Sequence, residues 1–367
     1  MKKLIAMLLA IALLASLCGC AGTTVVVGER TCPPDAHTPV ETPTEAPVEI
    51  PTPWPEDTPE GAFVKTGLAV IANVSGSAAA TAEANGKADY DITVAAVTVD
   101  ENGVIQSCVI DSIGTSVAFD AAGLPVDFDA AKAILTKNEL GDNYGMKAYG
   151  GAAFEWYEQA AALASYAVGK TVEELRAGAV DETGHAVDAD LATSATIYLE
   201  GYVSAIENAV FNAKHLGAQS GDELKLAIIP GVSSSKSADG ENAGLAQLDV
   251  DAAAITMKDG IITSAQIDSV QGKVNFDATG TITGGTDGIF ATKNLLGEQY
   301  GMVAWGGAIA EWDAQAASFC AYITGKTPAE VAGIAVNEGT KPVDADLATS
   351  VTIAIGGFQA LVAKACN

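Results

Sequence analysis

The heptapeptide Asp-Ala-Asp-Leu-Ala-Thr-Ser occupies residues 188–194 and occurs again, unchanged, at residues 344–350. The tripeptide Tyr-Gly-Met at residues 144–146 likewise returns at residues 300–302, and both pairs are separated by 156 residues. Solenoid repeats are only about 20–50 residues long. The much longer period of this chain indicates two homologous domains in tandem.

We therefore divide the chain into a leader at residues 1–19, a spacer at 20–62, a first domain at 63–216 and a second domain at 217–367. Apolar patterning in the first copy predicts a hairpin that turns at Asn102-Gly103, and strands at residues 68–74, 91–99 and 104–110. Helical periodicity predicts helices at residues 152–168, 171–175 and 196–214. Hairpins beside helices, without regular alternation of the two, favour an α+β fold.

Acidic residues dominate the charge of the chain. Its 19 Lys and Arg residues stand against 46 Asp and Glu residues, so the formal net charge is −27. The hydrophobic fraction of 49% is enough to bury a core, which argues against disorder of the whole chain. Nucleic-acid backbones and anionic lipid headgroups are bound by basic residues. The composition therefore predicts no nucleic-acid partner.

The first twenty residues resemble a bacterial lipoprotein leader. Lys2 and Lys3 precede an apolar run at residues 4–14, which is shorter than the ~20 residues of a membrane-spanning helix. A lipobox-like Leu-Cys-Gly then ends at Cys20, which would carry a diacylglyceryl anchor. An ordinary secretory leader with incidental cysteines is the alternative. We expect a lipid-anchored protein on the extracellular face of the bacterial cell membrane, with a net charge of −29 once Lys2 and Lys3 are removed.

The segment after the leader has the composition of a spacer. Residues 32–61 are mostly Pro, Thr and Glu, and proline recurs at every fourth position from Pro39 to Pro59. Such a segment favours polyproline II, and about 30 residues at ~3.1 Å each would reach roughly 90 Å. A plain disordered linker is the alternative, and both predict no packed core there. Trp54 is interpreted as incidental.

The cysteines and histidines do not predict a metal centre. Neither the six cysteines nor the three histidines have the spacing of a zinc, haem or iron–sulfur site. Cys108 and Cys320 lie in apolar segments, which is typical of small core residues rather than reactive thiols.

The repeated heptapeptide is expected to enter the helix predicted at residues 196–214. Its hydroxyl groups would then lie at a helix N-terminus, where free N–H groups and the helix dipole favour an anion. Thr193 or Ser194 could equally serve only as the N-cap of that helix. Helix physics alone does not distinguish Thr196 from its neighbours.

The segment from Asp190 to Thr196, Asp-x-x-Thr-Ser-Ala-Thr, resembles the flavinylation motif of FMN-binding domains, Asp-x-x-Ser/Thr-Gly-Ala-Ser/Thr. Such domains occur in sodium-pumping quinone reductase and Rnf complexes and in extracellular flavoproteins. The resemblance implies that a flavin transferase, using FAD and a divalent metal, attaches FMN through its phosphate to Thr196 and Thr352. The leader, spacer and two domains together resemble the flavinylated lipoproteins of Gram-positive extracellular electron transfer over essentially the whole chain.

Both copies depart from that motif. Ser194 and Ser350 stand where glycine is usual, and Val351 stands where the first copy has Ala195. We expect the bulkier Val351 to hinder access of the transferase to Thr352.

The resemblance also implies that a second repeated segment completes the flavin pocket, with methionines lining it, aromatic rings stacking on the flavin and paired glycines letting the ligand approach the backbone. The alternative is that these aromatic residues are core and the glycines only a turn. Lys137 and Lys293 are expected to be surface lysines, the alternative being that they face the phosphate or the flavin O2. Trp156 and Trp312 are expected to be core. The predicted site comprises Asp190, Thr193, Ser194, Thr196, Met146, Tyr149, Gly150 and Gly151 in the first copy, and Asp346, Thr349, Ser350, Thr352, Met302, Trp305, Gly306 and Gly307 in the second.

On this interpretation the protein is an electron carrier rather than an enzyme with a substrate of its own. It would pass electrons from a membrane quinone-linked dehydrogenase to extracellular acceptors such as ferric iron or quinones, through two FMN groups per chain. The resemblance also allows the leader to yield a peptide pheromone. The alternative function is a cofactor-free solute-binding or adhesive surface lipoprotein.

Overall fold

The computed structural model describes residues 63–366, and the predicted leader, lipidation site Cys20 and spacer lie outside this range. The first copy builds an antiparallel sheet in which the central strand β2 pairs with β1 and β3. These strands span Lys65–Asn73 (β1), Gly86–Val99 (β2) and Ile105–Phe119 (β3). The predicted strands and the hairpin are therefore confirmed, but the hairpin strands are longer than expected.

The second copy repeats this sheet in the order β4-β5-β6-β7. Its strands span Glu223–Gly231 (β4), Gly244–Lys258 (β5), Ile261–Phe276 (β6) and Ile282–Gly284 (β7). A two-residue strand of the second copy, β8 (Ile289–Phe290), leaves its own sheet and pairs with β1 of the first copy. The two copies are thus linked by backbone pairing within the first sheet.

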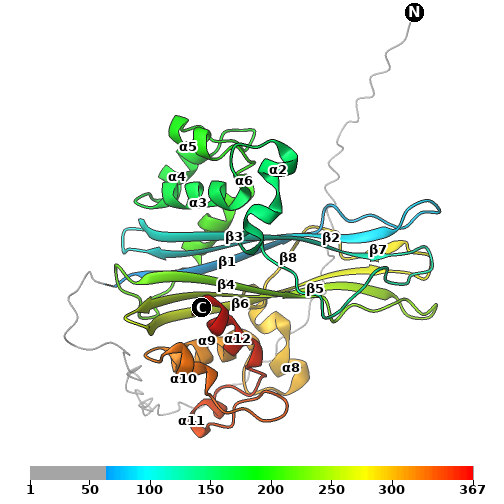
Figure 1. Cartoon of the computed structure of the whole chain (residues 1–367). Helices are drawn as coiled ribbons and strands as arrows, with labels where there is room; N and C mark the ends of the chain where they lie inside the picture. The colour runs from blue at the N-terminus through cyan, green and yellow to red at the C-terminus, as the bar shows by residue number, and fades with distance from the viewer. Residues whose placement is uncertain (1–62, 367) are drawn as a thin grey trace, which may run out of the picture. The chain divides into compact units, whose positions relative to one another are not determined.

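Each copy also contributes a set of helices (Figure 1). The first set comprises α1 (Lys137–Leu140), the 3-10 helix η1 (Gly141–Tyr144), α2 (Met146–Gly150), α3 (Trp156–Ala167), α4 (Val172–Ala179), α5 (Ala189–Ser194) and α6 (Glu200–Phe211). The second comprises α7 (Lys293–Leu296), η2 (Gly297–Tyr300), α8 (Met302–Gly306), α9 (Trp312–Ile323), α10 (Pro328–Ala332), α11 (Ala345–Ala348) and α12 (Gly356–Cys366). The α+β expectation is confirmed.

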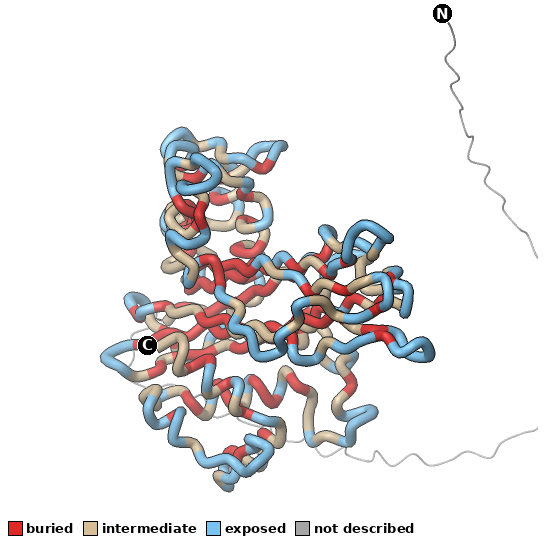
Figure 2. Tube along the Cα trace, turned by 45° about the vertical axis from the view of Figure 1, so that its right-hand side comes forward, coloured by how far each residue is buried: buried red, intermediate tan, exposed pale blue. Residues whose placement is uncertain are grey.

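The two sheets pack face to face between the two sets of helices. Alternate residues of β1, such as Leu68 and Val70, enter a core shared with β4–β6, whereas Ala69 faces the first set of helices. Within the shared core, the rings of Phe119 and Phe276, the last residues of β3 and β6, stack with centroids 4.1 Å apart. Figure 2 shows the resulting bands of buried residues along the strands. The described chain is therefore layered helix, sheet, sheet, helix (Figure 1).

Polar contacts also join the copies within this core. The Tyr90 hydroxyl donates to the carbonyl of Ala246 at 2.8 Å, and the Thr66 and Ser264 hydroxyls lie 2.6 Å apart. Buried polar groups must be hydrogen-bonded to avoid a desolvation cost, so these pairs fix how one sheet lies on the other.

Candidate functional site: two threonines held by buried glutamines

The repeated heptapeptide folds as a short helix of its own. Asp188 is the N-cap of α5, and its Oδ1 accepts from the N–H groups of Asp190 at 2.9 Å and Leu191 at 3.1 Å. Asp344 caps α11 in the same way. Thr193 lies at the opposite end of α5, where its hydroxyl donates to the carbonyl of Asp190 at 2.8 Å. Aspartate is thus the cap, and neither Thr193 nor Ser194 serves as one.

The expected position of these hydroxyls at a helix N-terminus is therefore wrong. Thr196 follows Ala195, which is extended, and precedes α6, which begins only at Glu200. Asp188 starts the helix early, and threonine and serine near its end bond back to preceding carbonyls instead. No anion-binding N-terminus is therefore formed by this segment.

Thr196 is held by the buried side chain of Gln159 in α3. Gln159 Oε1 accepts three hydrogen bonds, from Thr196 N at 2.7 Å, Thr196 Oγ1 at 3.2 Å and Ile197 N at 3.1 Å. Its Nε2 donates to the carbonyl of Phe154 at 3.1 Å, which fixes the orientation of the amide. Gln159 is fully buried, whereas Thr196 is exposed. The hydroxyl hydrogen points inward, so the oxygen lone pairs of Thr196 remain available on the solvent side.

The second copy reproduces this arrangement around Gln315 in α9. Gln315 Oε1 accepts from Thr352 N at 2.8 Å, Thr352 Oγ1 at 3.2 Å and Ile353 N at 3.2 Å. Its Nε2 donates to the carbonyl of Ala310 at 2.8 Å. Gln315 is also fully buried.

The two glutamines were missed in the sequence, although a signal was present. Gln159 and Gln315 are 156 residues apart, like the threonines they hold, and each is a polar residue within a helix whose neighbours at helical spacing are apolar. A repeated polar residue on a buried face needs a fixed partner. That partner is the backbone and hydroxyl of the repeated threonine.

Backbone conformation and burial account for the two positions at which this chain departs from the flavinylation motif. Neither Ser194 nor Ser350 has a positive φ, so a residue other than glycine fits there without strain. Val351 is fully buried in the core of its copy, as Ala195 is in the other, so the valine side chain does not cover Thr352. Slower access of the transferase to Thr352 stays a prediction.

The second repeated segment places an aromatic ring in solvent in each copy. Tyr149 in α2 is 92% exposed, and Trp305 in α8 is 85% exposed. Each ring lies over the glycine that precedes its helix, because a Cβ on Gly145 or Gly301 would come within 2.6 Å of a ring atom. The alternative that these two residues belong to the core is wrong. Trp156 and Trp312, by contrast, are buried as predicted.

The paired glycines that follow have open surroundings. Gly151 and Gly307 adopt positive φ and end α2 and α8, so glycine is favoured there by conformation. Gly150 and Gly306 have no positive φ, and a Cβ at either position would meet no atom within 4 Å. Since glycine weakens a helix relative to alanine, nothing within the described chain explains its presence at these two positions.

Met146 connects this segment to the threonine. Its side chain is half-buried, and Gln159 Nε2 lies 4.0 Å from its sulfur. Glu155 accepts from the backbone N–H groups of Met146 at 2.8 Å and Lys147 at 3.0 Å, and thereby fixes α2 against α3. Glu311 holds α8 in the same way. The structure thus brings the start of α2, Gln159 and Thr196 together, and the ring of Tyr149 lies back over Gly145 at this same end of α2.

The repeated Thr-Lys-Asn tripeptide has a structural role. Thr136 caps α1, and Asn138 donates from its side chain to the carbonyl of Ile110 at 2.9 Å. The Lys137 ammonium lies 5.1 Å from the centroid of the Trp156 ring and is buried. The expectation of a solvated lysine is therefore wrong for Lys137, because aromatic rings provide cation–π partners for its charge. Lys293 is likewise half-buried, and its ammonium lies 4.8 Å from the centroid of the Trp312 ring.

A buried carboxylate, Asp268, lies beneath the Thr292-Lys293-Asn294 tripeptide of the second copy and gives a pH-dependent prediction. Burial raises the pKa of Asp268 to about 6, although Thr292, Asn294 and Ser269 donate hydrogen bonds to it. The native state therefore binds this proton more tightly than the unfolded chain, so ionisation of Asp268 lowers stability as pH rises from about 4 to 6. We expect the Asp268→Asn variant to lack this loss, which amounts to about 2–3 kcal/mol. Urea unfolding at pH 4.5 and 7.5 measures the difference, and parallel pH profiles for variant and parent would contradict it.

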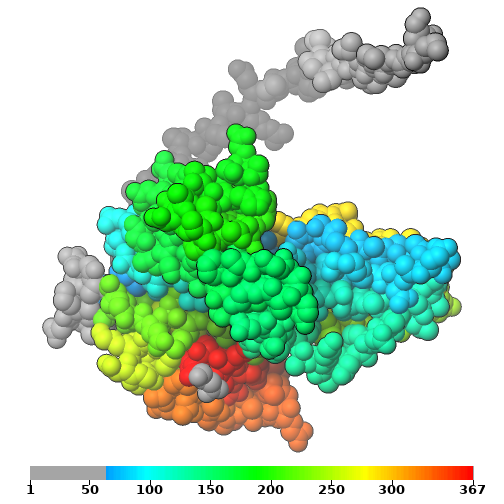
Figure 3. All heavy atoms as spheres, turned by 45° about the horizontal axis from the view of Figure 1, so that its top comes forward, coloured from blue at the N-terminus to red at the C-terminus, as the bar shows by residue number. Residues whose placement is uncertain are grey.

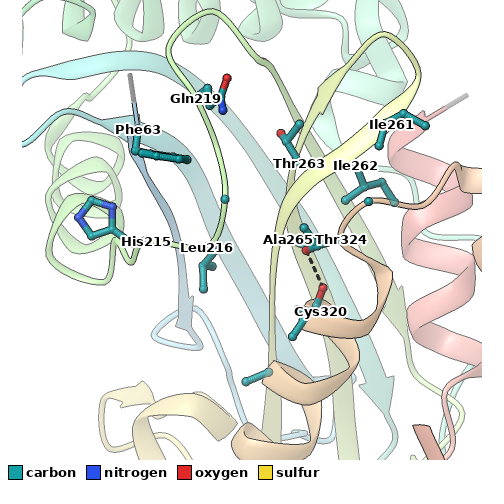
Figure 4. Close-up of a pocket in the computed structure, with 14 residues that line it drawn as sticks. Phe63, His215, Leu216, Gln219, Ile261, Ile262, Thr263, Ala265, Cys320 and Thr324 are labelled. Atoms are coloured by element: carbon teal, nitrogen blue, oxygen red, sulfur yellow. Dashed lines mark hydrogen bonds between the residues drawn. The ribbon is translucent and has the colours of Figure 1, made fainter. Parts of the chain in front are cut away.

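An apolar cavity lies away from these residues. It has a volume of about 470 Å³ and lies between β6, α9 and the segment that joins the two copies (Figure 4). Ile262, Ala265 and Cys320 contribute apolar side chains, and burial raises the pKa of the Cys320 thiol to about 12. Cys320 is thus the inert core residue that was predicted. None of the predicted flavin-site residues lines this cavity.

Among residues 63–366, no helix combines the length and the apolar character needed to cross a bilayer. Comparison of the chain with protein-family models, curated proteins and solved structures finds no match.

Proposed function

We propose that the protein is an electron carrier with FMN attached covalently to Thr196 and Thr352. The observation that carries this proposal is the repeated pairing of a buried glutamine with an accessible threonine hydroxyl. Gln159 and Gln315 each use one amide oxygen to bind both the backbone and the hydroxyl of the threonine. The same hydroxyl is thus oriented in both copies, on an exposed residue at Thr196 and on a half-buried one at Thr352.

Exposed features of α2 and α8 support a planar ligand, and in the first copy Met146 of α2 contacts the glutamine that holds the threonine. Tyr149 and Trp305 provide exposed aromatic faces on which an isoalloxazine can stack. The open space at Gly150 and Gly306 would let a ligand approach the backbone of α2 and α8. FMN, when bound, would supply the capacity to take up and release electrons. The protein's own residues would orient the hydroxyl and hold the attached ring near a helix surface.

The carrier would act outside the cell. We propose a flavin transferase for maturation, a membrane quinone-linked dehydrogenase as the electron donor, and ferric iron or quinones as extracellular acceptors. A lipid anchor at Cys20 would hold the chain at the membrane, and the Pro/Thr/Glu segment would extend the flavin domains outward. A covalent bond prevents loss of the cofactor by dilution outside the cell.

Intact-mass measurement after production with a flavin transferase tests this proposal. We expect two FMN-sized adducts per chain, one in each of the variants Thr196→Val and Thr352→Val, and none in the double variant. Valine has nearly the shape of threonine but no hydroxyl oxygen to modify. Transfer is also expected to be faster at Thr196, which is exposed, than at Thr352, which is half-buried. A colourless chain without adducts would favour the cofactor-free surface lipoprotein instead.

A further inference from the structure

The two threonines belong to helix layers on opposite faces of the double sheet. Gln159 lies in α3, which packs on the outer face of the first sheet, and Gln315 lies in α9, which packs on the outer face of the second. Figure 1 shows α5 and α11 on opposite sides of the strands. The space-filling view likewise has the green surface of the first helix set and the orange surface of the second on different sides (Figure 3).

The layer order sets a minimum separation between the two sites. Stacked sheets lie ~10 Å apart and a helix with its side chains is ~10–12 Å thick, so the axes of the two outer layers are roughly 30 Å apart. The space between them is filled by the shared core, whose members include Leu68, Val250 and the Phe119–Phe276 pair. Electron exchange falls steeply with distance through such packed apolar material.

We infer that the two attachment sites are separate electron-transfer centres that face in opposite directions, and that each exchanges electrons with its own partner molecules. This inference rests on the proposed function. The chain is therefore a two-sided carrier and not an internal relay. Tyr149 on one face and Trp305 on the other mark where each partner would make contact.

The consequence for partners is specific. A small diffusible oxidant reaches both faces and draws on both centres. A protein partner seated on one face receives electrons only from the centre on that face, and the other stays available to a second partner.

A distance measurement tests the geometry without any flavin. Spin labels are placed on the exposed equivalents Thr193→Cys and Thr349→Cys. In the full-length chain four other cysteines are replaced, through Cys18→Ser, Cys20→Ser, Cys32→Ser and Cys366→Ser. Cys108 and Cys320 are left, because burial raises the pKa of both thiols to about 12. Pulsed electron spin resonance is expected to give a separation of about 30 Å or more. A separation below about half that value would overturn the inference.

Reoxidation kinetics test the independence. The flavinylated chain and its single-site variants Thr196→Val and Thr352→Val are reduced and then mixed with ferricyanide. Each reduced flavin gives its two electrons to two ferricyanide ions and releases its protons to water. Distant sites behave additively within a few tenths of a kcal/mol, so each remaining flavin is expected to keep its rate within about twofold. A remaining flavin whose rate changes by more than about twofold would show that the two centres are not independent and would overturn the inference. Absence of adducts in the mass spectrum would defeat the proposed function instead, and the spin-label distance would still report the geometry.

Discussion

Replacing Gln159 by leucine is expected to abolish flavin attachment at Thr196 while leaving attachment at Thr352 unchanged. Leucine has a similar size but cannot accept the three hydrogen bonds that Gln159 Oε1 receives from Thr196 and Ile197. The hydroxyl would then rotate freely and the backbone that carries it would lose its fixed position. The unpaired N–H groups should also lower the free energy of unfolding by about 2 kcal/mol.

The chain contains its own control for this variant. Peptide mapping of the two adducts reports each threonine separately, so modification of Thr352 shows that the molecule is folded and accessible to the transferase. Gln315→Leu should give the reciprocal pattern. Equal labelling of Thr196 in parent and Gln159→Leu would contradict a positioning role.

A conservative variant separates positioning from simple loss of stability. Gln159→Glu keeps an oxygen acceptor for the three donors, but it loses the amide donor to the carbonyl of Phe154. We expect partial attachment at Thr196 in this variant, and more of it than in Gln159→Leu at matched stability. If the extent of attachment at Thr196 depended only on the free energy of unfolding of each variant, Gln159 would have no positioning role.

The local features of the fold could be predicted from the sequence because they depend on neighbouring residues. Thr171 with Glu174 three residues later is a capping box, and α4 begins there as expected. The hairpin between β2 and β3 follows from its apolar strands and its glycine turn. The duplication indicated two similar domains, and the glutamine–threonine pairs do recur in both.

The packing of one copy against the other could not be predicted from these local sequence patterns, although one strand indicated a second layer. Residues 92–99 of β2 are all buried, on both faces of the strand, whereas a sheet with one solvated face alternates. Six of these eight residues are apolar, which indicates a second layer over the strand but does not say which layer. The pairing of β8 with β1 depends on a contact between residues more than two hundred positions apart.

The start of the last helix was mispredicted for a related reason. The apolar stripe of α6 gave its face correctly, but its extension back to Thr196 ignored Asp188 as a stronger cap. Gln159 also opposes helix formation there. It accepts hydrogen bonds from the N–H groups of Thr196 and Ile197, which in a longer α6 would lie in its first turn. Only the tertiary structure shows this competition.

Replacing Phe276 by alanine is expected to destabilise both copies together. Phe276 is fully buried and stacks on Phe119 of the other copy, in a core to which both sheets contribute. Loss of a buried phenylalanine side chain costs about 3–5 kcal/mol in transfer and cavity terms. Because the inner faces of the two sheets cover each other, neither sheet keeps its buried surface if the other unfolds. The described chain should therefore unfold as one cooperative unit.

Hydrogen exchange across a urea series measures this coupling residue by residue. In Phe276→Ala, amides of β2 in the first copy and β5 in the second should lose protection at the same, lowered urea concentration. Phe211→Ala is the matched control, because Phe211 is 88% exposed and its removal should change stability by less than about 0.5 kcal/mol. If only the second copy shifted, the two sheets would be independent domains that merely touch. A common shift would mean that the fixed, opposite orientation of the two threonine sites is maintained by the same core that holds the protein together.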